Sequence, residues 1–245
     1  MLVPSQNPKK APSTVSSELL LVDKPAGISS FDVIRRLQRE SEYAGRKMGH
    51  AGTLDPLATG LMIIGLDGGT KRLAELIGLS KVYEAEFVIG LRTDSGDTDG
   101  QALEQWPADQ VASFCASLTP TRVEEVLAGM KGVLHLPVPI YSAIKRGGKK
   151  LYELARAGQT AEEIKPPVKE MTVESVRFLG LEKGVKGNLT ATDGLRVRVE
   201  LGVSSGTYIR SLGEEFGRRI GAPVTMSALR RTSIGEYLVK DARTI

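Results

Sequence analysis

The chain has 245 residues, of which 41% are hydrophobic and 25% are charged, and its net charge is +4. These values are typical of a globular protein with one sizeable core, and no stretch reaches the roughly eighteen apolar residues of a membrane span. A single cysteine, Cys115, excludes an intramolecular disulfide framework and fits a reducing compartment, so a cytoplasmic location is expected.

The N-terminal region predicts a disordered arm followed by a strand and a helix. Residues 1–17 mix prolines, lysines and serines without an apolar segment, so we expect an arm rather than a signal peptide. Residues 18–22 form a short apolar run that predicts a strand, and Ser29 or Ser30 can cap a helix that ends near Glu40. Two more elements are expected before residue 80, a buried strand at 61–66 and a short helix at 70–77.

Alternating apolar residues predict two long strands farther along the chain. Residues 83–91 and 195–203 place apolar side chains at every second position, which is the pattern of a half-buried strand. Because these strands alternate instead of being apolar throughout, the sequence favours an α+β fold with a mixed, mostly antiparallel central sheet and flanking helices.

The segments between and after these strands predict a loop and two helices. Asp94–Gly100 is typical of a turn-rich loop. Thr121 and Glu124 have the spacing of a capping box, which predicts a helix that ends near Met130. Residues 207–220 predict a second helix.

The segment 135–167 differs in composition from its surroundings. Prolines lie near both ends, lysine and glycine are frequent, and one helix is expected around 150–157. We therefore expect an inserted, hairpin-like element. Its basic cluster includes Lys145, Lys149 and Lys150, which can neutralise nucleic-acid phosphates, although a solvated surface is an equally simple reading of any one such cluster.

One carboxylate, Asp55, stands in a segment of small residues that runs from Gly49 to Gly60. Glycine permits backbone dihedrals that other residues avoid, and Pro56 fixes its own φ, so the segment predicts a shaped loop. Such a loop can aim a carboxylate at a substrate. The alternative is an Asp-Pro turn in which the side chain only caps the backbone.

Other kinds of chemistry find little support. Two histidines and one cysteine are too few for a common zinc site. Asp94, Asp97 and Asp99 have no glutamate at the spacing of a calcium loop, so a solvated acidic turn is expected there. Gly65–Lys71 lacks the Gly-Lys-Ser/Thr ending of a phosphate-binding loop, which argues against a nucleoside triphosphatase.

Several motifs, in order, resemble those of the TruB-type tRNA pseudouridine synthases. The segment around Asp55 is similar to the family's catalytic-aspartate motif, G-H-T-G-T-L-D-P-x-A-x-G, with Ala51 where the family generally has threonine. The similarity extends from about Glu18 to the C-terminus. The other segments that carry it are Leu21–Ser30, Lys81–Glu84, Gly90–Gly100, Pro139–Lys145, Gly148–Arg156 and Ser205–Leu212.

The resemblance implies the pseudouridine synthase fold. Residues 18–245 would form the catalytic domain, and the insertion at about 135–167 would be its RNA-gripping thumb. Members of the family commonly continue into a C-terminal RNA-binding domain of the PUA type, which this chain is expected to lack. Weaker and more salt-sensitive RNA binding than in a longer relative is therefore expected.

The resemblance also implies three catalytic residues. Asp55 would be the reacting carboxylate, Arg210 the arginine that pairs with it, and Tyr83 the residue that stacks on the uracil. An aspartate needs no base to activate it at neutral pH, and it could either attack C1′ or remove the C2′ proton to give a glycal. The sequence leaves both routes open.

Four further residues receive binding roles from the resemblance. His50 would fill the base stack after the target uridine flips out, which recovers part of the cost of flipping. Leu229 would line the pocket wall, and Lys24 and Lys71 would steer phosphates.

The expected activity is conversion of the uridine at tRNA position 55, in the TΨC loop, to pseudouridine by a monomer without metal or cofactor. One alternative is a tRNA-folding chaperone for which Asp55 is dispensable. A catalytic subunit of a guide-RNA complex is disfavoured, because the C-terminal domain expected to be missing usually docks such guides.

Overall fold

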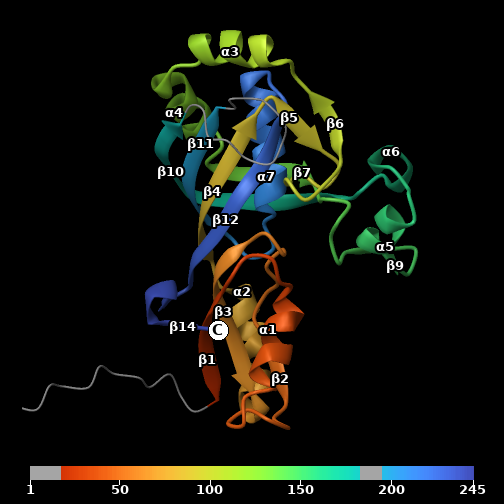
Figure 1. Ribbon diagram of the computed structural model, residues 1–245, viewed down its shortest axis with the longest axis vertical. Helices are drawn as coiled ribbons and strands as arrows, with labels where there is room; N and C mark the ends of the chain where they lie inside the picture. Colours follow the sequence, from red (N-terminus) through yellow and green to blue (C-terminus); the bar gives the residue numbers. More distant parts are fainter. Residues whose placement is uncertain (1–17, 183–194) are drawn as a thin grey trace, which may run out of the picture.

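A ten-stranded sheet organises the described part of the protein (Figure 1). The structure is a computed structural model that describes residues 18–182 and 195–245, so the arm predicted for residues 1–17 lies outside the described residues. The strands of the sheet are β1 (Leu19–Lys24), β2 (Met48–His50), β3 (Thr59–Leu66), β4 (Lys81–Ile89), β7 (Gly132–Pro137), β10 (Val168–Glu182), β11 (Arg196–Val203), β12 (Val224–Ile234), β13 (Tyr237–Leu238) and β14 (Arg243–Thr244).

The sheet is mixed and mostly antiparallel, as the sequence predicts. Its order is β14-β1-β3-β12-β4-β11-β10-β7, with β2 paired to β3 and β13 paired to β12. Only the β1–β14 and β3–β12 pairings are parallel among the strands described. Together with its flanking helices, this sheet confirms the expected α+β class.

The two halves of the sheet meet where β3 begins. There β3 pairs with β12 over only two residue pairs, Thr59 with Arg230 and Gly60 with Arg231. Gly60 has a φ of +104°, and a Cβ on it would lie 2.3 Å from the backbone oxygen of Arg231, so only glycine fits this crossing. The Arg230 guanidinium also binds the Asp23 carboxylate at 2.7 Å, which ties β1 to β12. In Figure 1 the loop that precedes β3 lies at this junction.

The N-terminal elements follow the sequence prediction closely. Helix α1 (Ser30–Leu37) begins with a capping box, in which the Ser29 side chain accepts from the Asp32 N–H and the Asp32 carboxylate accepts from the Ser29 N–H. The helix predicted at 70–77 is instead a 3-10 helix, η1 (Asp67–Arg72), followed by α2 (Leu73–Gly78).

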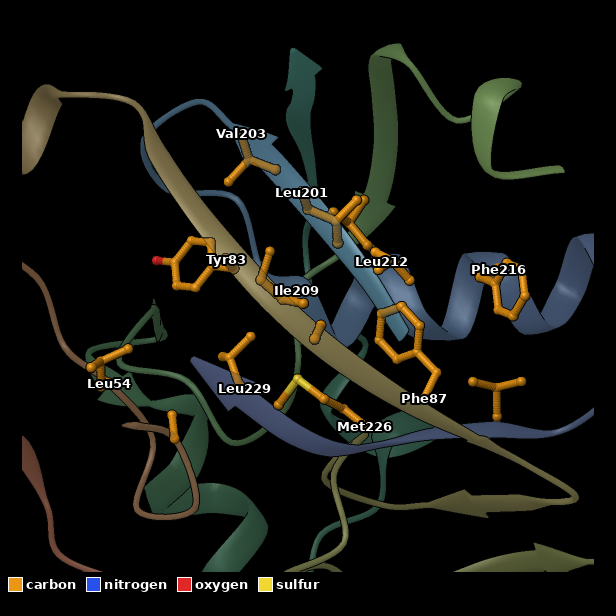
Figure 2. Packing of buried hydrophobic residues seen from close by; sticks show 14 of the residues in the cluster. Leu54, Tyr83, Phe87, Leu201, Val203, Ile209, Leu212, Phe216, Met226 and Leu229 are labelled. Atoms are coloured by element: carbon orange, nitrogen blue, oxygen red, sulfur yellow. The ribbon is translucent and has the colours of Figure 1, made fainter. Parts of the chain in front are cut away.

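The main core lies between the upper half of the sheet and helices α3 (Ala108–Ser117), α4 (Pro120–Ala128) and α7 (Ile209–Ile220). Figure 2 shows α7 packed over β4 and β12, with the rings of Phe87 and Phe216 stacked at 6.0 Å. The predicted capping box of Thr121 and Glu124 is wrong, because α4 is capped by Thr119. Proline at the first helical position costs no hydrogen bond, so the helix can begin at Pro120, earlier than predicted.

Residue 90 separates β4 from a small second sheet. Gly90 has a φ of +99°, so the strand predicted at 83–91 ends at Ile89 and the chain turns into β5 (Leu91–Thr93), which pairs with β6 (Ala102–Gln105). The loop between β5 and β6 contains the predicted turn-rich segment.

The inserted element leaves the sheet after β7 and returns at β10. It contains the two-residue strands β8 (Lys145–Arg146) and β9 (Lys149–Lys150), then α5 (Leu151–Arg156) and α6 (Ala161–Ile164). The predicted boundary at His135 needs correction, since His135 pairs with Glu170 inside the sheet. The insertion therefore begins at Val138, and it projects to one side of the sheet in Figure 1. No helix among the described residues has the length and apolar character to cross a membrane.

Candidate active site

The N-terminal motif, Leu21–Ser30, supports the Asp55 loop through hydrogen bonds. The Lys24 side chain is fully buried, and its ammonium group donates to the backbone oxygens of Pro25, Pro56 and Ala58 at 3.0, 3.2 and 2.5 Å. The Ser30 hydroxyl donates to the Leu54 oxygen at 3.0 Å and accepts from the Leu54 N–H at 2.8 Å. These bonds fix the backbone before and after Asp55, so the loop is rigid.

Asp55 and Arg210 form a two-point ion pair across 155 residues of sequence. Arg210 Nε lies 3.1 Å from Asp55 Oδ2, and Arg210 Nη2 lies 3.3 Å from Asp55 Oδ1. The rest of the guanidinium donates to the backbone oxygens of Ser95 at 2.8 Å and Tyr141 at 3.0 Å. A guanidinium bound at four points cannot rotate, so it holds the carboxylate in one orientation.

A second carboxylate, Asp97, lies behind the same arginine. Its Oδ2 is 3.7 Å from Arg210 Nε, its side chain is 7% exposed, and its Oδ1 accepts from the Ser95 hydroxyl at 2.6 Å. The solvated acidic turn expected at Asp94, Asp97 and Asp99 is therefore wrong for Asp97, whose loop is hydrogen-bonded to the backbone of Met226 in β12 through Gly96 and Thr98.

Burial and neighbouring charges act on the Asp55 carboxyl in opposite directions. Desolvation is the largest influence and raises its pKa, with a further rise from the negative charge of Asp97. Arg210 is the main influence that lowers the pKa, and Lys24 adds to it. The net direction is upward, so the ionised form of Asp55 depends on Arg210.

Asp55 and Arg210 line a cavity of about 870 Å³. Its wall also includes Tyr83 from β4 and Tyr141 and Arg156 from the insertion, so the sheet and the insertion face each other across it. Tyr208, the residue before α7, completes this side of the cavity.

A smaller recess of about 100 Å³ lies next to the carboxylate. Its lining includes Asp55 and Arg210 and the apolar side chains of Leu54 and Leu229, together with Tyr83. Figure 2 shows Leu54, Tyr83 and Leu229 arriving from the loop, β4 and β12 around this space. A flat, neutral ring with polar edges fits a recess in which leucine side chains and a tyrosine ring stand beside hydroxyl groups and one ion pair.

The other residues predicted to bind RNA lie in different surroundings. His50 lies in β2, where its ring is partly buried and Nδ1 has no hydrogen-bond partner among the described residues. Burial and the charge of Arg231 lower the His50 pKa. Lys71 is exposed on η1 and does not line the cavity. Lys24 needs correction, because its side chain is fully buried and does not line the cavity, so it supports the loop and does not meet a phosphate.

The lysines of the insertion lie at its tip. Lys145 pairs with Lys150 and Arg146 with Lys149 in the β8–β9 hairpin, where Lys145 and Lys149 are exposed. The Lys150 ammonium group lies 5.3 Å from the centre of the Tyr152 ring, which itself lines the cavity.

Three neighbours of the ion pair have no individual role in the sequence analysis. Asp97, Tyr141 and Ser95 lie in motifs that the family resemblance covers, but nothing local distinguishes them from loop residues. Among residues 18–182 and 195–245, no group of three or more histidine, cysteine, aspartate or glutamate side chains is arranged to hold a metal ion.

Comparison with known proteins identifies the family. Residues 39–209 match the TruB family pseudouridylate synthase, N-terminal domain. The chain is 39% identical over 230 residues to tRNA pseudouridine synthase B of Thermobifida fusca (strain YX), which covers 93% of this chain and 72% of the relative. It is 38% identical to the protein of the same name from Leifsonia xyli subsp. xyli (strain CTCB07), over 94% and 71% of the two chains.

Solved structures agree on the fold. A chain of a Cbf5-Nop10-Gar1 complex matches with a TM-score of 0.63 at 23% identity, over 93% of this chain and 52% of that chain. A chain of an H/ACA RNP bound to a substrate RNA containing 2′-deoxyuridine matches with a TM-score of 0.62 at 21% identity, over 93% and 50%. With the family match over most of its length and the fold of these neighbours, the chain belongs to the TruB family of pseudouridylate synthases.

Proposed function

We propose that this pseudouridine synthase acts on tRNA and isomerises the uridine at position 55, in the TΨC loop. Relatives at 38–39% identity carry the name tRNA pseudouridine synthase B, which supports tRNA as the substrate. The observation that carries the chemistry is the Asp55–Arg210 pair in the wall of a small recess that Tyr83 and Leu229 also line.

Each residue of the recess has a part in the proposed reaction. The target uridine leaves its stack, and its base enters the recess between Tyr83 and Leu229. Asp55 then either attacks C1′ or removes the C2′ proton. By either route the N1–C1′ bond breaks, the base turns, and a C5–C1′ bond forms while N1 gains a proton and C5 loses one. In the first route the new C5–C1′ bond displaces Asp55 from C1′, and in the second Asp55 returns the proton to C2′. Arg210 keeps Asp55 ionised in a site from which the base excludes water.

The rest of the RNA would lie along the insertion. Lys145, Lys149 and Lys150 are proposed to contact the phosphates of the T-arm, with the hairpin acting as the thumb. His50 is proposed to occupy the place of the flipped base. The protein is proposed to act as a monomer, and a tRNA substrate supports a cytoplasmic location.

Tritium release from a tRNA transcript labelled at C5 of its uridines tests the proposal. We expect release by the wild type and by Asp109→Asn, a control at an exposed acid of α3. Asp55→Asn should bind the transcript and release at least about 1,000-fold more slowly, because the amide is neither nucleophile nor base. Cytidine at position 55 should abolish release.

Three outcomes contradict the proposal in different ways. Appreciable release by Asp55→Asn would overturn the assignment of the reacting residue. Release that continues from the transcript with cytidine at position 55 would overturn the target position. No release by any variant, with the transcript still bound, would favour the chaperone.

A further inference from the structure

A pair of buried cations without an anionic partner lies beside the Asp55 loop. Lys81 is 6% exposed and Arg231 is 1% exposed, and both line the large cavity. Lys81 Nζ donates to the backbone oxygens of Ile77 at 2.8 Å and Leu79 at 2.5 Å. Arg231 donates through Nε to the Leu61 oxygen at 2.7 Å and through Nη2 to the Gly52 oxygen at 3.2 Å.

These carbonyls are the only polar partners of the two side chains in the part of the chain that the structure describes. Carbonyl oxygens satisfy donors but do not neutralise charge. A buried charge is costly unless an opposite charge accompanies it, and here two like charges share one region. Burial, with a further contribution from the charge of Arg231, lowers the pKa of Lys81 to about 8, which agrees with a buried cation that has no anion beside it.

The two cations converge on Gly52. A Cβ on this residue would lie 3.6 Å from Arg231 Nη1 and 3.9 Å from Lys81 Cε. Gly52 has a φ of +101° and lines the cavity. Because it has no side chain, the Nη1 edge of the guanidinium, which makes no hydrogen bond within the described residues, stays uncovered beside the lysine.

The strands place this pair directly next to the recess for the base. Lys81 and Tyr83 lie two positions apart on β4, as do Leu229 and Arg231 on β12, so each pair shares a face of its strand. Arg231 is also the cross-strand partner of Tyr83. One continuous surface therefore runs from the side chains of Tyr83 and Leu229 to the cations Lys81 and Arg231. A nucleoside and its adjoining phosphate have the same order of groups.

We propose that Lys81 and Arg231 form a subsite for the RNA phosphodiester group that adjoins the target uridine. The ligand is a single phosphate anion, and it supplies the charge that the two side chains lack. The proposal rests on the proposed function for the nature of the substrate. In this proposal the subsite contributes to RNA affinity independently of the phosphate contacts that the insertion makes.

Binding of a fluorescent T-arm stem-loop, followed by anisotropy over a range of salt concentrations, tests the subsite. Lys81→Met should weaken binding about tenfold and lower the slope of log Kd against log salt by about 0.7 to 0.9, the share of one phosphate contact. Lys81→Arg should restore most of the slope. Lys131→Met, at an exposed lysine outside the cavity, should match the wild type.

A neutral methylphosphonate placed in turn on each side of the target uridine locates the contact. At one of the two positions it should weaken wild-type binding by the same factor as Lys81→Met, and the two changes together should cost no more than either alone. Losses that multiply at both positions, or an unchanged salt slope in Lys81→Met, would overturn the proposal. The proposal would also be overturned if inorganic phosphate binds at Lys81 and Arg231 and the affinity for the RNA stays unchanged.

Tritium release measured on the same samples separates the two proposals. Wild-type release together with a Lys81→Met variant that binds like the wild type would overturn the phosphate subsite alone. Wild-type binding without release would overturn the proposed function, while the methylphosphonate and salt data would still decide whether the cations hold a phosphate.

Discussion

Replacement of Arg210 tests how far Asp55 depends on its partner. Arg210→Met removes both ion-pair contacts to Asp55 and leaves the Ser95 and Tyr141 oxygens without their donor. Loss of one partner from a buried ion pair costs about 3–5 kcal/mol of stability, and because the Asp55 side chain is still 32% exposed, we expect the lower end, about 3 kcal/mol. The carboxylate also loses its fixed orientation, and misplacement of a reacting group by about 1 Å costs roughly 100-fold in rate, which is the loss we expect.

The pH dependence should change in a defined direction. Activity requires ionised Asp55, so it falls as the pH drops through the pKa of this carboxyl. Burial already raises that pKa, and Arg210 is the main group that lowers it. Arg210→Met should therefore move the acid limb of the pH–rate profile to higher pH. Arg210→Lys keeps a cation without the two-point geometry, so it should move the limb less while still losing rate.

Single-turnover tritium release from pH 5 to 9 measures both effects. Arg218→Met is the matched control, because Arg218 lies on the same helix with a side chain that is 71% exposed, and it should stay within twofold of the wild type. An Arg210→Met enzyme within threefold of the wild-type rate, with its acid limb in the same place, would refute the reasoning.

Two further predictions concern stability. Gly60→Ala should lower the free energy of unfolding by about 3 kcal/mol in urea titrations, from its φ of +104° and the contact with the Arg231 backbone, whereas Gly78→Ala, which meets nothing within 4 Å, should be nearly neutral. The pKa of Lys24 is lowered by burial from 10.5 to about 8, so between these pH values the folded state binds fewer protons than the unfolded state. Unfolding free energy should then rise with pH in this window, by about 3 kcal/mol for Lys24, and Lys24→Met should remove that share while the similar share of Lys81 remains. An equal rise in wild type and variant would contradict the burial of Lys24.

Local patterns explain why some elements could be predicted from the sequence. The capping serine at 29 or 30 and the alternation in β4 and β11 are signals within a few residues, and the structure confirms those elements, with Ser29 as the cap. The sequence does not predict β10, which carries charged residues at five positions, or β12, in which the adjacent Arg230 and Arg231 interrupt the apolar pattern. In β12, Arg230 forms an ion pair with Asp23, and Arg231 donates hydrogen bonds to two backbone oxygens. Both sets of contacts exist only where the two halves of the sheet meet.

The site shows a sharper division. Asp55, Tyr83 and Arg210 are identified by family resemblance, and no local pattern joins Asp55 to an arginine 155 residues away. Asp97 looks solvated because acidic turns usually are, and Lys24 looks exposed because lysine is rarely buried. Both are buried through contacts that the tertiary structure creates, with Arg210 in one case and three loop carbonyls in the other.

The cavity is therefore divided by charge. Arg210 faces two carboxylates, so that end of the cavity already carries its anions and favours a neutral base beside Asp55. Among the described residues, Lys81 and Arg231 face only carbonyl oxygens, so this end of the cavity lacks an anion there. If the proposed subsite holds a phosphate, a free base would occupy the first end alone and an isolated phosphate the second. A nucleotide within an RNA chain would occupy both, and because each contact is weak by itself, the proposed site would favour a uridine that arrives with its backbone attached.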